Sequence, residues 1–477
     1  MAASISPSPT ILLPLLPPNT IVGIDLITFT STPNFHGIRD LPVGWHFLYT
    51  GTTESLSLRS GGWFHIGSEN GDKDEDIAPV DTLAVGPRGA ATEVLIWKWD
   101  SETETLASLD PANDADKQEA LRWKANLGAV WQAGGLFRYR SRVSVAQSHT
   151  GNAVTATDDN HETETVGRRD WERLTDCLSS RLLTRVIGDP RADIDGRLRW
   201  TVTSASSAVR DNDDIPGLAP EDSSRVTGEA ESAFGFLPVD LKRTWREGAI
   251  GRERTEAAQD RSWALGEMLR QVVADGSGPG SGSESERAAE RQVLGELQFT
   301  FLMGLTLVNY SCLQQWKRLL ELVLTCQRAI RDRERFMSDV LRLLLVQLKR
   351  CDDIEGGLFD LDGEEGGEFL RNLLVKFRRS LYEVVSDGDG AGSTIEQEFA
   401  RLEAWVHDEY NWELNREAVV RRGMVRLEDG EEVELEMNDD DGDDEIGEYA
   451  PMVVDVVEDA PASIHDDEAS DNDDPRM

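Results

Sequence analysis

Short apolar and aromatic runs alternate with turn residues in the first hundred positions of the chain. Runs at Ile21–Leu26, Trp45–Tyr49 and Val94–Trp99 have the length of single strands, and residues such as Pro, Asn and Gly bound them. Several strands of this length, separated by turns, are typical of a β-rich domain. We therefore predict a β-rich N-terminal domain over residues 1–188.

Helical periodicity follows the strands within the same region. Apolar residues recur every three or four positions over Lys117–Trp131 and Trp171–Val186, which predicts helices trailing the sheet. Residues 141–165 are rich in Ser, Thr, Asp and Asn without such periodicity, so we predict a flexible insertion there. Residues 189–233 are similarly polar. They are predicted to be the linker to a second domain with a core of its own.

The pattern is helical throughout residues 234–414. Its strongest stretch is Val293–Ile330, where apolar residues recur every three or four positions on both sides of an expected bend at Asn309–Ser311. Other helical patterns cover Thr255–Val273, Arg335–Lys349, Phe369–Val384 and Ile395–Trp412. Helices of this length joined by short loops pack as a bundle or as a right-handed α-solenoid. The predicted fold class is therefore α+β, a β-rich N-terminal domain followed by an all-α C-terminal domain.

A different alternation follows the last helix. Between residues 415 and 437, apolar and charged residues alternate on both sides of Asp429-Gly430, which is typical of a β-hairpin. An isolated hairpin is marginal in water, so we predict a partner-binding segment that adds to the edge of another protein's sheet. The alternative is a hairpin folded back on the chain's own β-rich domain. The candidate binding residues are Val425, Leu427, Val433, Leu435 and Met437.

Negative charge is concentrated at the end of the chain. The formal net charge is −40, and residues 427–477 contain 22 Asp or Glu and one Arg. A chain of this charge lacks the basic surface that nucleic acids require, so no direct nucleic-acid binding is expected. Residues 438–477 have the composition of a disordered acidic tail. This tail leaves open a second function, that of a chaperone for basic clients such as histones or ribosomal proteins.

The cysteines and the apolar runs indicate the cellular environment in which the chain is expected to fold. The cysteines lack metal-ligand spacing, and three of them fall in apolar helical patterns, which predicts buried, reduced thiols in a reducing compartment. No apolar run approaches the roughly 20 residues that a membrane span needs, so no membrane partner is expected.

Candidate chemistry is sparse. The chain has no nucleotide-binding, hydrolase or metalloprotease motif, and we predict a protein that is not an enzyme and has no cofactor. The spacing of His36, His46 and His65 favours structural or surface histidines over metal ligands. The segment Asp387–Glu398 partly matches a calcium-binding loop, but a glycine-rich loop before a helix N-cap is the simpler interpretation.

A regulatory hypothesis concerns the loop that precedes the Val293 helix. Ser283 has Glu286 three positions later, the context that acidophilic kinases favour. A phosphate adds about 1.5–2 negative charges near a helix N-terminus, where it can order the loop or repel an acidic partner surface. The candidate sites are Ser281, Ser283 and Ser285, and an unregulated flexible loop is the alternative.

Several segments in a fixed order resemble one known family. They are Gly23-Ile24-Asp25, Phe35-His36-Gly37-Ile38, Pro42–Leu48, Trp245–Ala249, Val293–Phe301 and Trp316–Leu320. The most specific is the string Leu-Gly-Glu-Leu-Gln-Phe at residues 294–299, followed by Trp-Lys-Arg-Leu-Leu at residues 316–320. Together they resemble the Aar-two family of pre-mRNA splicing factors, over roughly residues 10–414.

The resemblance implies both a fold and a function. Members of the Aar-two family are assembly factors of the U-five small nuclear ribonucleoprotein. They hold its scaffold protein, Prp-eight, through RNase H-like and Jab/MPN-like domains, and they delay binding of the helicase Brr-two. Their helical domain resembles the VHS/ENTH superhelices, and their C-terminal tail bridges the scaffold's domains as a strand. The resemblance thus implies a non-enzymatic assembly chaperone of the cytoplasm and nucleus with a Prp-eight-like partner.

Overall fold

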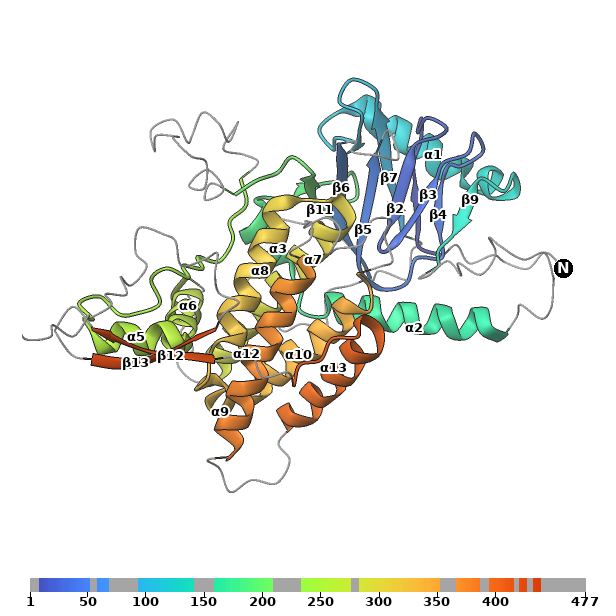
Figure 1. Ribbon diagram of the computed structural model, residues 1–477. Helices are drawn as coiled ribbons and strands as arrows, with labels where there is room; N and C mark the ends of the chain where they lie inside the picture. Colours follow the sequence, from blue (N-terminus) through green and yellow to red (C-terminus); the bar gives the residue numbers. More distant parts are fainter. Residues whose placement is uncertain are drawn as a thin grey trace, which may run out of the picture. The chain divides into compact units, whose positions relative to one another are not determined.

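The computed structural model describes residues 8–51, 58–67, 93–140, 158–208, 233–275, 283–351, 366–386, 394–415, 420–426 and 432–438. The chain divides into two compact units. One consists of residues 1–246 with 257–414, and the other of residues 247–256 with 415–477. Figure 1 shows two β-sheets and a group of long helices in the larger unit, and a two-stranded sheet in the smaller one.

The first sheet of the larger unit has five strands in the order β8-β7-β1-β4-β9. These strands are β1 (Thr10–Leu12), β4 (Gly37–Arg39), β7 (Val94–Asp100), β8 (Thr105–Ser108) and β9 (Leu136–Arg138). The central strand β1 pairs in parallel with β7 and antiparallel with β4. Helix α1 (Asp114–Gln132) covers the outer face, where Val94 and Ile96 share a core with Val130.

The second sheet has six strands in the order β10-β11-β6-β5-β2-β3. They are β2 (Ile21–Ile24), β3 (Ile27–Thr30), β5 (Gly44–Gly51), β6 (Arg59–Ile66), β10 (Arg191–Ala192) and β11 (Leu198–Thr203). One face of this sheet packs on the first sheet, where Leu48 and Phe64 share a core with Trp97. Because successive strand residues alternate between faces, Phe47 and Trp63 belong to the opposite face and to a different core.

Helices α2 (Asp158–Thr175), α3 (Ser180–Ile187) and α7 (Ser283–Leu307) pack on that opposite face (Figure 1). The other helices of the same core are α6 (Ser262–Asp275), α8 (Tyr310–Leu324), α9 (Ala329–Asp332), α10 (Glu334–Leu348), α12 (Gly366–Ser386) and α13 (Thr394–Tyr410), and the short helix α5 (Arg252–Gln259) precedes α6. The predicted bend separates α7 from α8. There the Asn309 side chain caps α8 by accepting a 2.9 Å hydrogen bond from the backbone N–H of Cys312.

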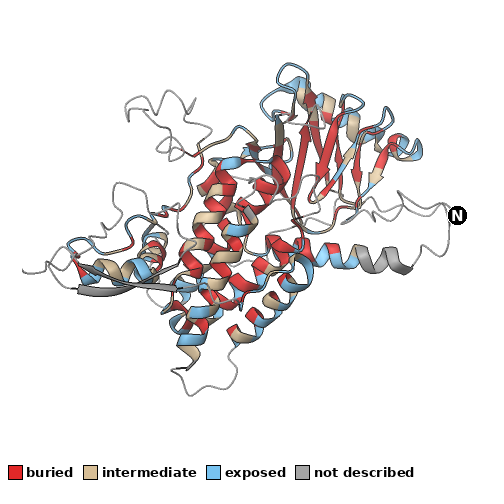
Figure 2. Cartoon of the chain, viewed as in Figure 1, coloured by how far each residue is buried: buried red, intermediate tan, exposed pale blue. Residues whose placement is uncertain are grey.

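The predicted fold class is confirmed, but the prediction of separate cores is wrong. A single core continues from the outer face of the six-stranded sheet into the helices. The Trp63 ring lies 6.4 Å from the Phe299 ring of α7, and Figure 2 shows buried residues on strands and helices alike. The six-stranded sheet is apolar on both faces, so it needs the helices to cover the face turned away from the first sheet.

Three local predictions also need correction. Residues 191–203, predicted as linker, form β10 and β11, because Trp200 and Val202 alternate along β11 and are buried. Helix α2 already begins at Asp158, within the predicted insertion 141–165. The helix predicted over Thr255–Val273 is interrupted because the Asp260 carboxylate accepts hydrogen bonds from the Ser262 and Gln327 backbones. The rest of the insertion and residues 439–477 lie outside the described residues.

Candidate functional site

The predicted hairpin consists of β12 (Val420–Arg426) and β13 (Glu432–Asn438). The strands are antiparallel, with Val420 opposite Asn438 and Arg426 opposite Glu432. This register is centred on position 429, where the Asp-Gly pair predicted the turn. Within the described residues, the two strands form a sheet of their own that includes no strand from elsewhere in the chain.

The register gives the hairpin two chemically different faces. Val425 lies opposite Val433, and Gly423 lies opposite Leu435, so these positions share one face with Met437. Within the described strands, the single charged position on this face is Arg421, opposite Met437. The other face is mainly charged, since Arg422 lies opposite Glu436 and Arg426 opposite Glu432, and it also holds Met424 opposite Glu434. Four of the five predicted partner-binding residues therefore fall on one face. The fifth, Leu427, lies outside the described residues.

The candidate phosphorylation sites surround the start of α7. The prediction of a loop is wrong at Ser283 and Ser285, because α7 begins at Ser283 and Ser285 lies in its first turn with a half-buried side chain. Ser281 lies outside the described residues. The acidic residues Glu284 and Glu286 occupy the same turn, which suits the positive end of the helix dipole.

The most specific string of the sequence, at residues 294–299, lies in the middle of α7 and is buried. Glu296 has 0% of its surface exposed, and its carboxylate accepts hydrogen bonds from three directions. Arg185 Nη1 donates at 2.7 Å, Gln315 Nε2 at 2.8 Å and the backbone N–H of Leu237 at 2.9 Å. One buried carboxylate thus joins α3, α7, α8 and the segment before α5.

Gly295 and Gln298 bring α7 against the end of α2. A Cβ atom at Gly295 would lie 2.6 Å from the Cys177 carbonyl oxygen and 2.4 Å from a Leu182 methyl group, so only glycine permits this approach. Gln298 Nε2 donates to the Arg173 carbonyl at 2.8 Å, and its Oε1 accepts from the Cys177 N–H at 3.0 Å. We call the contacts of Gly295, Glu296 and Gln298 the seam, because they join the sheet-bearing part of the chain to the helices.

A second buried polar cluster occupies the sheet-bearing part. The Asp25 carboxylate accepts hydrogen bonds from Tyr139 Oη at 2.6 Å, His46 Nδ1 at 2.9 Å and the Phe47 backbone N–H at 3.0 Å. Asp25 has a φ of 57°, the left-handed turn conformation that Asp tolerates better than most residues. The neighbouring Gly23 leaves space for the Tyr49 ring, which a Cβ atom would approach to 2.0 Å.

The histidines and cysteines do not assemble a metal site in the described part of the chain. No group of three His, Cys, Asp or Glu side chains there has the arrangement of metal ligands. His46 is a buried structural residue, as one of the two interpretations predicted. Burial raises the pKa of the Cys177 thiol to about 12, so this cysteine is a poor nucleophile. The calcium-like loop at residues 387–393 lies outside the described residues.

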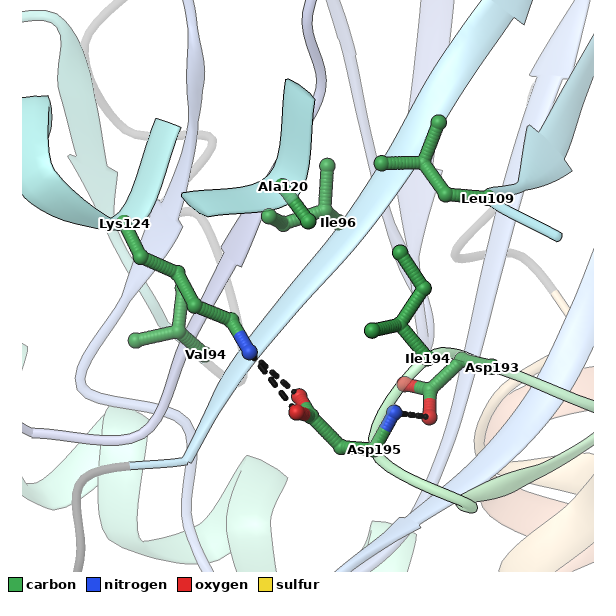
Figure 3. Close-up of a pocket in the computed structure, with 8 residues that line it drawn as sticks. All are labelled: Val94, Ile96, Leu109, Ala120, Lys124, Asp193, Ile194 and Asp195. Carbon is green, nitrogen blue, oxygen red and sulfur yellow. Dashed lines mark hydrogen bonds and ion pairs between the residues drawn. The ribbon is translucent and has the colours of Figure 1, made fainter. Parts of the chain in front are cut away.

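A shallow cavity lies between α1, β7 and the β10–β11 turn (Figure 3). Its volume, including the part open to solvent, is about 210 Å³, below the roughly 300–1,000 Å³ of small-molecule sites. Lys124 Nζ donates to both Asp195 carboxylate oxygens, at 2.7 and 2.8 Å, so its charge is already paired. Burial raises the pKa of Asp193, whose carboxylate accepts the Asp195 N–H at 2.9 Å. The cavity therefore has the character of a structural gap rather than an active site.

Comparison with known proteins agrees with this arrangement. The family model for the AAR2 N-terminal domain matches residues 7–188, and that for the AAR2 C-terminal repeat region matches residues 236–415. The chain belongs to the AAR2 family. The Protein AAR2 homolog of Mus musculus is 24% identical over 86% of this chain and 90% of its own length. That of Homo sapiens is 23% identical with the same coverage, and that of Caenorhabditis elegans is 25% identical over 82% of this chain and 91% of its own length.

Membership of the AAR2 family supports a splicing-related role for this chain, and neither matching family model is that of a catalytic family. The resemblance to the Aar-two family is thereby confirmed. No helix in the described part of the chain is long and apolar enough to cross a lipid bilayer.

The residues by which this AAR2-family chain was recognised are largely buried. Glu296, Gln298 and His46 all have 2% or less of their surface exposed, so they hold the fold together rather than present a surface. Sequence reasoning did not assign contacts to the seam. A signal was available, because a Glu and a Gln inside an apolar helical run require buried hydrogen-bond partners.

Proposed function

We propose that this AAR2-family protein is a non-enzymatic assembly chaperone of the U-five small nuclear ribonucleoprotein. It binds a Prp-eight-like scaffold through the scaffold's RNase H-like and Jab/MPN-like domains, in the cytoplasm and the nucleus, and delays binding of a Brr-two-like helicase. Family membership over most of the chain supports the general role. The observation that carries the choice of binding segment is the two-faced hairpin of β12 and β13.

The hairpin suits strand addition to a partner sheet. Its two strands leave outer edges that pair with no other described strand, and edge strands offer unpaired N–H and C=O groups. A partner strand added at one edge gains main-chain hydrogen bonds, while the face of Val425, Val433, Leu435 and Met437 provides apolar contacts. In the two described strands, the opposite face carries five charged positions, Arg422, Arg426, Glu432, Glu434 and Glu436, so the face of Val425, Val433, Leu435 and Met437 is the one that we expect to be buried.

Substitution of the apolar face tests this assignment. Val433→Asp with Leu435→Asp in the full chain should weaken binding to the purified scaffold domains by at least about tenfold. Burial of each such side chain contributes roughly 1.5–3 kcal/mol, and about 1.4 kcal/mol corresponds to tenfold in affinity. Calorimetry or surface plasmon resonance measures the affinity, and a thermal unfolding curve checks that the main transition is unchanged.

The opposite face supplies a matched control. Val420→Asp with Met424→Asp also places two aspartates on apolar positions of the same hairpin, but on its other face. This control should bind more tightly than the Val433/Leu435 variant. Equal affinity for the wild type and the Val433/Leu435 variant would contradict the strand-addition assignment.

Removal of residues 439–477 separates the proposal from the chaperone for a basic client. Scaffold binding should survive this deletion, because the hairpin ends at Asn438. A chaperone that shields histones or ribosomal proteins would instead lose its client, since 16 of the acidic residues lie beyond Asn438. Loss of scaffold binding on deletion would favour the second function.

A further inference from the structure

His46 is enclosed by hydrogen-bond acceptors. Its ring lies within β5 with 1% of the side chain exposed, close to the rings of Phe64 and Tyr139 at 5.6 and 5.5 Å. Nδ1 lies 2.9 Å from an Asp25 carboxylate oxygen, and Nε2 lies 2.9 Å from the Pro42 carbonyl oxygen. Neither ring nitrogen is left to solvent.

Both acceptors require a proton on the ring. A backbone carbonyl has no proton to donate, and an ionised carboxylate only accepts. Neutral imidazole carries one N–H, so it would place the lone pair of its other nitrogen against an oxygen. Only the doubly protonated ring donates in both directions, and it also neutralises the buried Asp25 carboxylate.

We propose that His46 is a pH-sensitive clamp: as an imidazolium it ties the turn between β2 and β3, strand β5 and the residue following β9 together, and its deprotonation loosens this junction of the two sheets. Asp25 lies in that turn, His46 is on the six-stranded sheet, and Tyr139 follows the edge strand of the five-stranded sheet. The hydrogen bonds from Tyr139 and His46 meet on one Asp25 oxygen, so loss of the ring charge affects both contacts.

The neighbouring charges agree with this geometry. Burial lowers the pKa of His46, but the charge of Asp25 and the hydrogen bonds to Asp25 and Pro42 outweigh it, so the pKa is raised overall. Arg168 on α2 opposes this rise. Tyr139 stays a hydroxyl donor because burial and the Asp25 charge hold its pKa well above the usual value, with a smaller contribution from Glu164.

The raised pKa fixes the sign of the pH dependence. The folded chain binds the His46 proton more tightly than the unfolded chain, whose histidines have a pKa of about 6.5. The clamp therefore contributes fully below the unfolded value, and its contribution disappears as the pH rises through the folded value. Each unit by which the folded pKa exceeds the unfolded one corresponds to about a tenfold change in the unfolding constant.

The ring protonation can be observed directly in the full chain labelled with ¹⁵N at histidine. At pH 6.5, nuclear magnetic resonance should show protons on both ring nitrogens of His46, assigned by their loss in His46→Gln or by their proximity to the Tyr139 and Phe64 rings. Asp25→Asn keeps the size of the side chain but removes its charge, and it should shift the His46 titration to lower pH. A ring with a single proton at pH 6.5 or below would overturn the proposal.

Urea unfolding between pH 6 and pH 8.5 gives the energetic test. The unfolding constant of the wild type should rise with pH relative to that of His46→Gln, while His407→Gln, at an exposed position on α13, should follow the wild type. Parallel pH profiles for the wild type and His46→Gln would also overturn the proposal. If His46→Gln does not fold, the wild-type ring protonation decides, with His46 assigned by its proximity to the Tyr139 and Phe64 rings.

Discussion

The seam and the hairpin differ in whether they pair with other elements in the described part of the chain. In the seam, every described hydrogen-bonding direction of the Glu296 carboxylate ends on a group from another helix or segment. In the hairpin, the two strands find only each other among the described residues, although one face is apolar. The Glu296 carboxylate of the seam is therefore satisfied within the fold. The hairpin pairs with no other described strand, which is why we assign stability to the seam and propose binding for the hairpin.

This contrast also explains why the residues that resemble the family and the proposed binding residues do not coincide. A buried carboxylate such as Glu296 tolerates little change, because loss of one partner leaves another buried group unsatisfied. Glu296 belongs to the string at residues 294–299 that carries the most specific resemblance to the family. The hairpin requires only alternation and a turn, which many sequences satisfy, so its residues carry little family signal even if they contact the partner.

The largest effect is expected from removal of the seam carboxylate. Glu296→Ala should lower the free energy of unfolding by about 3–5 kcal/mol, because it strands the buried N–H of Leu237 and removes the acidic partner of Arg185. Urea denaturation followed by circular dichroism measures the loss. The matched control is Glu284→Ala, at an exposed position in the first turn of the same helix, and it should change stability far less. Similar losses for the two variants would contradict the special role of the seam.

A smaller effect is expected from closing the gap between α7 and the end of α2. Gly295→Ala places a methyl group against the Cys177 carbonyl and the Leu182 side chain, and overpacking of this kind costs about 1–3 kcal/mol. Gly128→Ala in α1 is the control, since nothing lies within 4 Å of its Cβ position. That control should stabilise the helix by roughly 0.5–1 kcal/mol, so thermal unfolding should shift in opposite directions. A stabilising effect of Gly295→Ala would contradict the close packing of the seam, because the neighbouring groups would then accommodate a methyl group without a loss of stability.

Local patterns predicted the elements well but did not predict which faces meet. The strand and helix periods are properties of neighbouring residues, so β5, β7, α1 and the bend at Asn309 were foreseeable. Strand β11 was missed because its apolar residues, Trp200 and Val202, are embedded in a polar stretch. The shared core was missed for a different reason. The sequence of a strand that is apolar on both faces, such as β5, does not show which elements pack on each face.

The candidate site divides in the same way. The Asp-Gly pair and the alternation around it predicted the hairpin, because both depend on adjacent residues. They did not predict its register, in which Val425 lies opposite Val433. The contacts of Glu296 come from residues up to 111 positions away, as with Arg185, and no local pattern reports such a distance. The polar network of Asp25, His46 and Tyr139 was invisible for the same reason, with 114 positions between Asp25 and Tyr139.

The smallest expected effect concerns the start of α7, the helix that also carries the seam residues. Replacement of Ser281, Ser283 and Ser285 together by Glu mimics phosphorylation and adds negative charge beside the helix N-terminus, where the dipole favours it. Folding stability should therefore stay within about 1 kcal/mol of the wild type, while affinity for an acidic scaffold surface should fall by less than tenfold. The corresponding triple alanine variant controls for loss of the hydroxyl groups. A weaker effect at high salt would identify charge repulsion, because exposed charges are screened beyond about 10 Å at 0.1 M salt. Equal affinity of the glutamate and alanine variants at low salt would show that charge at the start of α7 does not regulate binding.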